Sequence, residues 1–368
     1  MKLQFLLILL IPILANFYVM WHVWQILPVS HVWKWVAVGI LALVFACFFL
    51  ALSRRLDQLP MWLAQGIYET GTSWVIILLY LLMFFLLADV CRLLHIIPAA
   101  YLKNSLTGTL VTAGIMLLVF GYGSFRYHQK QRHDMQITTA KPHARDLRIV
   151  MLSDLHIGYH NRRAELERWI QMINAEHPDM VLIAGDIIDR SLRPLIDDND
   201  AEAFRKIEAP VYACLGNHEY FAGQQGSLDF YREAGIHLLR DSVANLEGIS
   251  IVGRDDRSNP HRHSLKELMQ QAKRDNFIVV LDHQPYFLEE AERCGADLQL
   301  SGHTHHGQVW PDNHITESIY ECAYGAHRRG NTHYYVSSGM GIWGGKFRIG
   351  TVSEYVVIDI TTSPRTTL

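Results

Sequence analysis

Two histidines that follow an apolar strand form the most chemically suggestive stretch of this chain. Within Leu298–Gln308, the sequence LQLSGHTHHGQ places His303 and His305 two residues apart. Side chains at this spacing leave the same face of an extended backbone, and Gly302 permits a sharp bend after the strand. Imidazole is a common metal ligand, so the two rings supply half of the ligands of a metal site.

Four other short motifs follow apolar segments and have the same character. Each offers Asp, His or Asn at the carboxyl end of a predicted strand, where α/β sheets place their ligand sites. They are Asp154-Leu155-His156, Gly185-Asp186, Gly216-Asn217-His218-Glu219 and Asp282-His283. Mixed carboxylate and imidazole ligands suit Mn, Fe or Zn better than Mg or Ca, and they are too many for one tetrahedral ion. The sequence therefore predicts a site for two divalent metal ions.

Each motif taken alone has an ordinary structural interpretation. Asn217 is an acceptable turn residue, Asp186 is an acceptable helix cap, and a single histidine is most often structural. Five such motifs, all at strand ends, are instead expected of one functional site.

Together these motifs resemble the calcineurin-like metallophosphoesterase superfamily. The resemblance covers about Leu147 to Ile360. The longer stretch Gly302–Pro311, together with Gly339–Gly350, is similar to the branch of that superfamily with N-terminal membrane segments. This chain has His306 where that branch usually has glycine, a departure that spares the ligands and offers one more imidazole behind them.

The resemblance implies a four-layer α/β/β/α sandwich with a binuclear metal centre, in which Asp186 bridges the ions. A shared carboxylate offsets part of the repulsion between two neighbouring cations. The ligands implied for the first ion are Asp154, His156, Asp186 and His305, and those implied for the second are Asp186, Asn217, His283 and His303.

Three further residues are assigned to chemistry on the substrate. The histidine that matches His218 in the superfamily stabilises the transition state or protonates the leaving group, and Asp189 matches the acid that orients it. Arg190 is a candidate for bidentate binding of a phosphate group. The alternative is that Arg190 is an ordinary exposed surface residue with no role in the site.

The chain before Arg126 is apolar and almost uncharged. Apolar runs occupy about residues 3–27, 35–52, 74–97 and 106–125, and each is long enough to cross a bilayer as a helix. Tryptophans lie near the ends of these runs, as in an aromatic belt. A signal peptide is the alternative for the first run, but that run is long, rich in aromatic residues and not followed by a cleavage motif.

We expect three parts in the chain: a transmembrane region over 1–125, a polar juxtamembrane linker over 126–146 and a metallophosphoesterase domain over 147–368. The side of the membrane that is richer in short-loop Lys and Arg should be cytoplasmic. This rule predicts a multi-pass protein of the plasma or inner membrane with both termini and the catalytic domain in the cytoplasm. The richer side carries Lys2, Arg54, Arg55, Arg126, Lys130 and Arg132, against Lys34, Arg92 and Lys103 on the other.

Two segments allow two interpretations each. Asp89 and Arg92 lie three residues apart in the third run, as a local ion pair near the interface or as an intramembrane functional site, and we favour the ion pair. The glycine-rich stretch Ser338–Arg348 is expected to be a loop. It forms either a wall of the site, with Trp343, Phe347 and Arg348 touching lipid, or a tight connection into the last strand.

Charge and cysteine content exclude other classes of protein. Of the 33 basic and 36 acidic residues, six and three precede Arg126, which leaves 27 and 33 after it and a net charge of −6. Such a domain is a poor candidate for binding nucleic acid through phosphate contacts. The five cysteines include no Cys-x-x-Cys pair, so we expect reduced thiols.

The sequence predicts a membrane-anchored phosphohydrolase that uses two metal ions to cleave phosphoester or pyrophosphate bonds. The bilayer is its expected partner, and phosphorylated or nucleotide-linked lipids are favoured substrates because anchoring raises their effective concentration. Cyclic nucleotides and phosphoproteins are the alternative substrates for such an enzyme. The alternative to an enzyme is a membrane sensor or transporter whose soluble domain binds metal without catalysis. His218 and Asp189 beside a full ligand set favour the enzyme, and the few charges in the helices disfavour a transport path.

Overall fold

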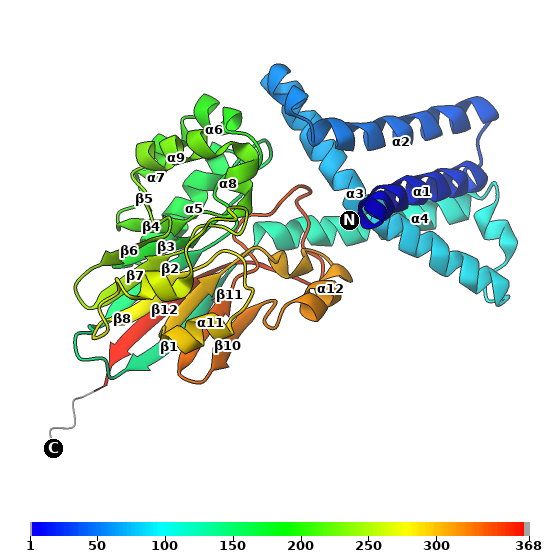
Figure 1. The fold of residues 1–368 in the computed structure, drawn as a ribbon. Coiled ribbons are helices and arrows are strands. Elements are labelled where there is room, and N and C mark those ends of the chain that lie inside the picture. The colour runs from blue at the N-terminus through cyan, green and yellow to red at the C-terminus, as the bar shows by residue number, and fades with distance from the viewer. Residues whose placement is uncertain (1, 364–368) are drawn as a thin grey trace. The chain divides into compact units, whose positions relative to one another are not determined.

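The computed structural model describes residues 2–363, with side chains from residue 10 onward, and the described chain divides into two units (Figure 1). The helical unit comprises the residues before Arg126 together with Gly344–Lys346. The second unit, here called the sandwich unit, comprises the residues from Arg126 to Trp343 and those from Phe347.

Long apolar helices make up the described part of the helical unit. They are α1 (Lys2–Ile26), α2 (His31–Ala51), α3 (Met61–Leu93) and α4 (Leu106–His128). Short 3₁₀ turns at Arg54–Gln58 and Ala99–Leu102 lie in the connections. Helices α2, α3 and α4 are long and apolar enough to cross a membrane. In α1, the part whose side chains are described, Leu10–Ile26, is a shorter apolar helix. Three of the four predicted runs thus meet the requirements of a membrane span, and the first is not shown to do so.

The helices pack through small and aromatic residues. Gly71 of α3 lies so close to α2 that an added Cβ would be 2.5 Å from the backbone of Cys47, which small residues in membrane helices allow. Trp74 of α3 is buried and donates a hydrogen bond to Asn16 of α1 over 3.1 Å. Helix α3 begins at Met61, well before the run predicted from residue 74, because its first turns are less apolar but still helical.

Two six-stranded mixed sheets form the centre of the sandwich unit within the described residues. The first sheet has the spatial order β1 (Lys130–Thr139), β12 (Ser353–Thr362), β2 (Leu147–Leu152), β3 (Met180–Ala184), β4 (Val211–Cys214) and β5 (His237–Leu238). The second has the order β10 (Gly325–Arg329), β11 (Thr332–Val336), β9 (Leu298–Ser301), β8 (Phe277–Leu281), β7 (Ile249–Gly253) and β6 (Ser242–Asn245). Strands β2 to β5 are parallel, and so are β7, β8, β9 and β11.

The two sheets pack face to face because successive side chains of a strand point to opposite faces. Leu182 of β3 joins Ile251 of β7 and Val279 of β8 in one core between the sheets. The neighbours Val181 and Ile183 belong instead to a second core, on the outer face of the first sheet.

Helices cover both outer faces, so the sandwich unit has four layers (Figure 1). Trp169 and Phe204 pack on the first sheet, and Leu268 and Ala291 pack on the second. This arrangement confirms the predicted α/β sandwich. The helices are α5 (Arg163–Ala175), α6 (Arg193–Asp197), α7 (Asp200–Phe204), α8 (Asn217–Ala222), α9 (Gln224–Glu233), α10 (Leu265–Met269), α11 (Glu289–Cys294) and α12 (Asp312–Ile319).

The segment predicted as a linker, 126–146, differs from that expectation because it contains the edge strand β1. Strand β1 pairs in parallel with β12, with Ile137 opposite Ile360. Its sequence, KQRHDMQITT, is polar enough to hide the strand pattern. Edge strands carry charged side chains that discourage pairing with other molecules, and this accounts for the linker-like composition.

Candidate metal centre

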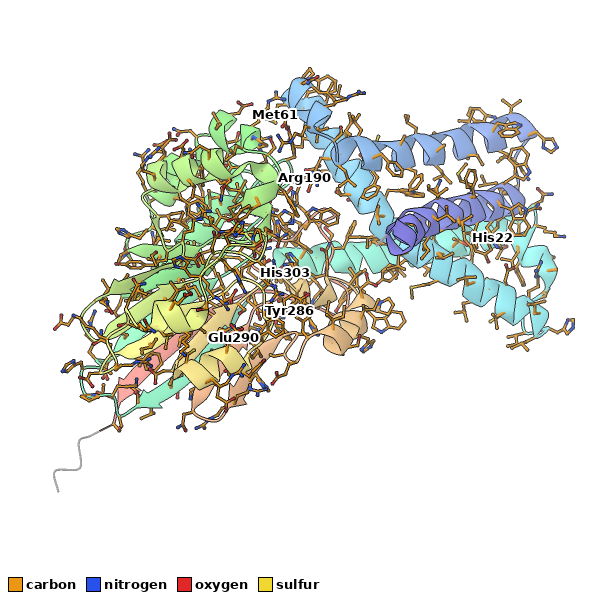
Figure 2. All side chains as sticks on the ribbon, in the orientation of Figure 1. His22, Met61, Arg190, Tyr286, Glu290 and His303 are labelled. Carbon is orange, nitrogen blue, oxygen red and sulfur yellow. The ribbon has the colours of Figure 1, made fainter. Side chains whose placement is uncertain are left out.

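The predicted ligands converge because the strands that precede them end at one edge of the two sheets. Asp154 and His156 follow β2, Asp186 follows β3 and Asn217 follows β4, and these three strands are parallel neighbours. His283 follows β8, and His303 and His305 follow β9, its parallel neighbour in the other sheet. Figure 2 labels His303 at this edge.

Five of these ligand residues have a left-handed backbone, with φ between 46° and 73°. Side-chain-bearing residues rarely adopt this conformation, which costs of the order of 1 kcal/mol or more each and persists where the surroundings enforce it. Backbone hydrogen bonds supply that enforcement, such as the one from the Asp154 amide to the Gly185 carbonyl at 3.1 Å. The strained residues are Asp154, His156, Asp186, His303 and His305.

The first group of candidate ligands is formed by Asp154, His156 and His305. The Nε2 atoms of the two histidines lie 3.1 Å apart. Oδ1 of Asp154 lies 3.9 Å from Nε2 of His156 and 3.5 Å from Nε2 of His305. The three atoms therefore surround one point.

The second group contains Asp186, His283, His303 and Asn217. Oδ2 of Asp186 lies 3.2 Å from Nε2 of His283, and one ligand atom each of Asp186, His283 and His303 lies within 4.8 Å of the others. Oδ1 of Asn217 lies 2.9 Å from Nδ1 of His303. Asp186 also reaches the first group, because the same Oδ2 is 3.7 Å from Nε2 of His156.

These distances fit bound cations. Ligands about 2.1 Å from one ion lie roughly 3.0–3.5 Å from one another, close to the spacings within both groups. Nε2 of His283 is buried and makes no hydrogen bond, although it faces a carboxylate. Burial lowers the pKa of His303 to about 4 and that of His305 to about 3, so both imidazoles are neutral, the form that binds metal.

Buried negative charge at the site also favours cations. Asp154, Asp186 and Asp189 are all buried. Burial lowers the pKa of His156, but the carboxylates of Asp154 and Asp189 outweigh that effect and raise the pKa to about 10. The carboxylates thus draw a proton onto this histidine, and a cation between the ligands would supply the same compensating charge.

Two glycines are required by the close approach of the ligands. A Cβ on Gly216 would lie 2.1 Å from Oδ1 of Asp186, and a Cβ on Gly302 would lie 2.2 Å from Oδ2 of Asp154. Any side chain at either position would therefore displace a ligand.

Glu219 has a positioning role that the sequence prediction missed. It is buried, and its carboxylate accepts hydrogen bonds from the amides of Asp186 at 3.2 Å, Ile188 at 3.0 Å and Gly216 at 2.7 Å. It thereby ties the loop after β3 to the loop after β4. An acidic residue directly after Asn217-His218 is the signal in the sequence that indicates such a role.

His218 and Asp189 lie together beside the first group. Nδ1 of His218 is 2.8 Å from the backbone carbonyl of Asp189 and 3.5 Å from its Oδ1. The same Oδ1 lies 3.3 Å from Nδ1 of His156. Asp189 thus contacts a predicted ligand as well as the predicted acid, a double role that the sequence did not indicate.

Arg190 and His306 are placed differently from the ligands. Arg190 is partly exposed and follows Asp189 directly in the chain. The imidazole of His306 lies 2.9 Å from Oε1 of Glu317 and stacks on Tyr324 at 4.6 Å between ring centroids. Its φ of 49° is a backbone conformation that glycine adopts more readily than histidine. The contacts of its imidazole with Glu317 and Tyr324 do not involve a predicted metal ligand, and an additional imidazole behind the ligands stays a prediction.

Arg348 is the second positioning residue missed from the sequence, which offered lipid contact as one of two interpretations of its loop. It is fully buried, and its guanidinium donates to the carbonyls of His305 at 2.7 Å and Gly341 at 3.3 Å. It therefore joins the histidine loop to the glycine-rich loop. A long cationic side chain in a glycine-rich connection reaches several carbonyls at once, which explains its burial.

Comparison with known proteins assigns a family to this site. The calcineurin-like phosphoesterase family model matches residues 147–307. An uncharacterised metallophosphoesterase of Bacillus subtilis is 30% identical over 254 residues, which cover 63% of this chain and 87% of that protein. The chain belongs to the calcineurin-like metallophosphoesterase family. An uncharacterised member from Campylobacter jejuni is 33% identical over 234 residues, and the match covers 62% of this chain and only 62% of that relative's length.

Another relative extends the similarity to the helical unit. A transmembrane protein with a metallophosphoesterase domain from Danio rerio is 28% identical over 345 residues, 88% of this chain and 79% of its own. That share is larger than residues 147–368 alone can provide. The match and the three apolar helices together indicate that this metallophosphoesterase associates with a membrane.

Proposed function

We propose that this protein is a membrane-anchored phosphohydrolase that uses two divalent metal ions, Mn, Fe or Zn, to open phosphoester or pyrophosphate bonds. The observation that carries the proposal is the place of Asp186, whose Oδ2 is 3.2 Å from Nε2 of His283 and 3.7 Å from Nε2 of His156. A carboxylate between two ligand groups is suited to bridging two cations. Asp154, His156 and His305 would complete one ion, and Asn217, His283 and His303 the other.

His218, Asp189 and Arg190 have separate proposed roles beside the metal ions. Bound divalent ions would polarise the phosphoryl oxygens and activate a water molecule. His218 donates from Nδ1 to the carbonyl of Asp189, since a carbonyl only accepts, and this leaves Nε2 to exchange a proton with the leaving group. Asp189 fixes that ring orientation. Arg190 follows Asp189 directly and is the residue we propose for binding a substrate phosphate.

We propose a lipid-linked substrate and a cytoplasmic domain on four membrane-spanning helices. One residue separates the end of α4 at His128 from the start of β1 at Lys130, so the domain is tethered to a membrane helix. Exposed apolar residues on and before α12, namely Trp310, Ile315 and Ile319, suit an amphiphilic substrate.

The proposed activity is tested with full-length protein in detergent, on bis-nitrophenyl phosphate and on a nucleoside-diphosphate-linked lipid. Chelation should abolish hydrolysis, and Mn²⁺ should restore it. H303A should lose activity because a ligand is removed, whereas H314A, which changes an exposed histidine of α12, should keep it. Hydrolysis that survives both chelation and H303A would overturn the proposal.

A further inference from the structure

A partly buried polar cluster lies inside the helical unit, far along the chain from the metal ligands. Oδ2 of Asp89 in α3 accepts a hydrogen bond from the Tyr18 hydroxyl at 2.7 Å and lies 3.1 Å from Nε2 of His22. Oδ1 of the same carboxylate lies 3.4 Å from the guanidinium of Arg92. His22, labelled in Figure 2, is buried and stacks on Phe85. Asp89 is therefore not only the partner of Arg92 in a local ion pair. It also joins α3 to α1 through its contacts with Tyr18 and His22.

A cavity of about 110 Å³ adjoins this cluster. Water occupies about 30 Å³ per molecule in the liquid, so the cavity has room for a group the size of a phosphate. Its charged lining consists of two cations, Arg92 and Lys103, and one anion, Asp89, with His22 and Gln25 beside them. The lining therefore carries a net positive charge when His22 is neutral, and it is complementary to an anion.

Backbone hydrogen bonds build one wall of the cavity. The amides of Asn104 and Ser105 donate to the carbonyls of Gln25 and Ile26, each over 2.8 Å. These bonds hold the segment that carries Lys103 on the last turn of α1. Lys34 is buried and donates to Asn104 over 2.6 Å, which secures the same segment to α2.

An apolar groove of about 290 Å³ lies next to the cavity, and Leu102 lines both. Its other lining residues include Phe84 and Cys91 of α3 and Val111 of α4. Phe84 lies nine residues before the end of α3 at Leu93, about 13 Å at 1.5 Å per residue. The groove therefore extends from the helix ends, where headgroups lie, toward the apolar middle of the helices.

We infer that this pair of features is a binding site for one membrane lipid with a phosphate headgroup. The cavity takes the phosphate between Arg92 and Lys103, and the groove takes part of an acyl chain. Its position at the ends of α1 and α3, with exposed Trp21 beside it, matches the depth at which phosphates and interfacial aromatic residues lie. Charged groups at this depth are retained where they bind or pair.

The test uses full-length protein in nanodiscs with a photoactivatable phosphatidic acid that carries a diazirine in its acyl chain. Chelator is present throughout, so binding at the metal centre is suppressed. After irradiation, adducts are mapped by peptide mass spectrometry. We expect adducts within residues 84–112, and we expect excess phosphatidic acid to prevent them where diacylglycerol, which has no phosphate, does not.

Two pairs of variants separate the cavity from the groove. R92Q/K103Q should reduce labelling of 84–112 by about tenfold or more, because both cations that face the headgroup are removed. R54Q/R55Q removes the same charge from the connection between α2 and α3 and should leave the labelling unchanged. V111W fills the groove and should reduce labelling, whereas L118W, on an exposed part of α4 outside the groove, should not.

Three results would overturn the inference. The first is adducts spread over all the helices. The second is equal loss of labelling in R92Q/K103Q and R54Q/R55Q, which indicates unspecific charge attraction. The third is full labelling in V111W together with competition by inorganic phosphate as strong as by lipid, which indicates a site for a free anion. None of these three results is a measurement of turnover. The test is therefore independent of whether the sandwich unit hydrolyses phosphoesters.

Discussion

Asp189 contacts both His156, a predicted metal ligand, and His218, the predicted acid. Substitutions at these positions can therefore separate the chemistry of the site from metal binding. Its Oδ1 lies 3.3 Å from Nδ1 of His156 and 3.5 Å from Nδ1 of His218. A carboxylate behind a metal-binding imidazole fixes its orientation, and its loss typically costs 10–100-fold in metal affinity or activity. His218 contacts Asp189 but is not needed to complete either group of ligands.

The contrast between H218A and D189N follows from this geometry. H218A should retain both metals and lose about 10²–10⁴-fold in turnover of an unactivated phosphoester, the usual value of a general acid. Its loss should be smaller with a nitrophenyl leaving group, which needs little protonation. D189N should lose turnover and also bind the ion at His156 more weakly, by about 10–100-fold.

Turnover on both substrates and metal titration of each variant check the contrast. Metal loss in H218A would mean that His218 is itself a ligand. Unchanged metal affinity in D189N would remove Asp189 from the support of His156.

Connections between elements, more than the elements themselves, fix the geometry of the site. Glu219 ties the loop after β3 to the loop after β4, and Arg348 ties the turn that carries His305 to the glycine-rich connection between β11 and β12. Buried networks of this kind are costly to break in part, because the remaining polar groups stay buried without partners.

R348M should therefore weaken the site as well as the fold. We expect a loss of about 1–3 kcal/mol or more in stability, because the carbonyls that accept from Arg348 would stay buried without a donor. We also expect weaker metal binding at the ion that His305 serves. The apparent Tm and metal titration measure the two effects. R328M, which removes an exposed arginine of the β10–β11 hairpin, is the matched control. An R348M variant with unchanged Tm and metal affinity would contradict this role.

The buried Asp200 of helix α7 leads us to predict that stability depends on pH independently of the metals. Burial, and then the charge of Asp198, raises the pKa of Asp200 from 3.8 to about 7. The unfolded chain ionises at lower pH than the folded one, so stability falls between about pH 4 and pH 7 and stays lower above. D200N removes this loss and should raise the apparent Tm at pH 8 much more than at pH 4.

The pKa shift of Asp200 sets the size of this loss of stability, and Asp197 provides a control. The full effect of the shift is at most roughly 4 kcal/mol, since one pKa unit is worth about 1.4 kcal/mol. D197N changes a neighbouring exposed carboxylate that pairs with Arg193 and should shift Tm little at either pH. Equal stabilisation of D200N at pH 4 and pH 8 would contradict the assigned pKa.

At the scale of the whole molecule, the sequence predicted the sandwich and the membrane association but not every feature of either. Continuous apolar runs such as Met180–Ala184 marked the buried central strands, and the ligand motifs at their ends indicated one site. Strand β1 was missed because its polar residues resemble those of a linker. Left-handed turns at Asp154 and His305, and the burial of Arg348, depend on contacts between segments far apart in sequence, which no local pattern contains.

The membrane topology stays a prediction. The bias of Lys and Arg motivates an arrangement with both termini in the cytoplasm and four spanning helices. A reporter fused after Ile360 should be active only in its cytoplasmic form. Single cysteines in the sandwich unit should react with impermeant reagents only after lysis. Labelling of the sandwich unit from outside intact cells would contradict this orientation.

The most direct test of the account is the metal content of D186N. Purified wild-type protein should contain two divalent ions per chain by elemental analysis. Because Oδ2 of Asp186 faces ligands of both groups, D186N should lower the occupancy of both ions, whereas D229N, on the surface of α9, should leave both in place. One ion per chain in the wild type, or two fully occupied ions in D186N, would contradict a binuclear centre bridged by Asp186.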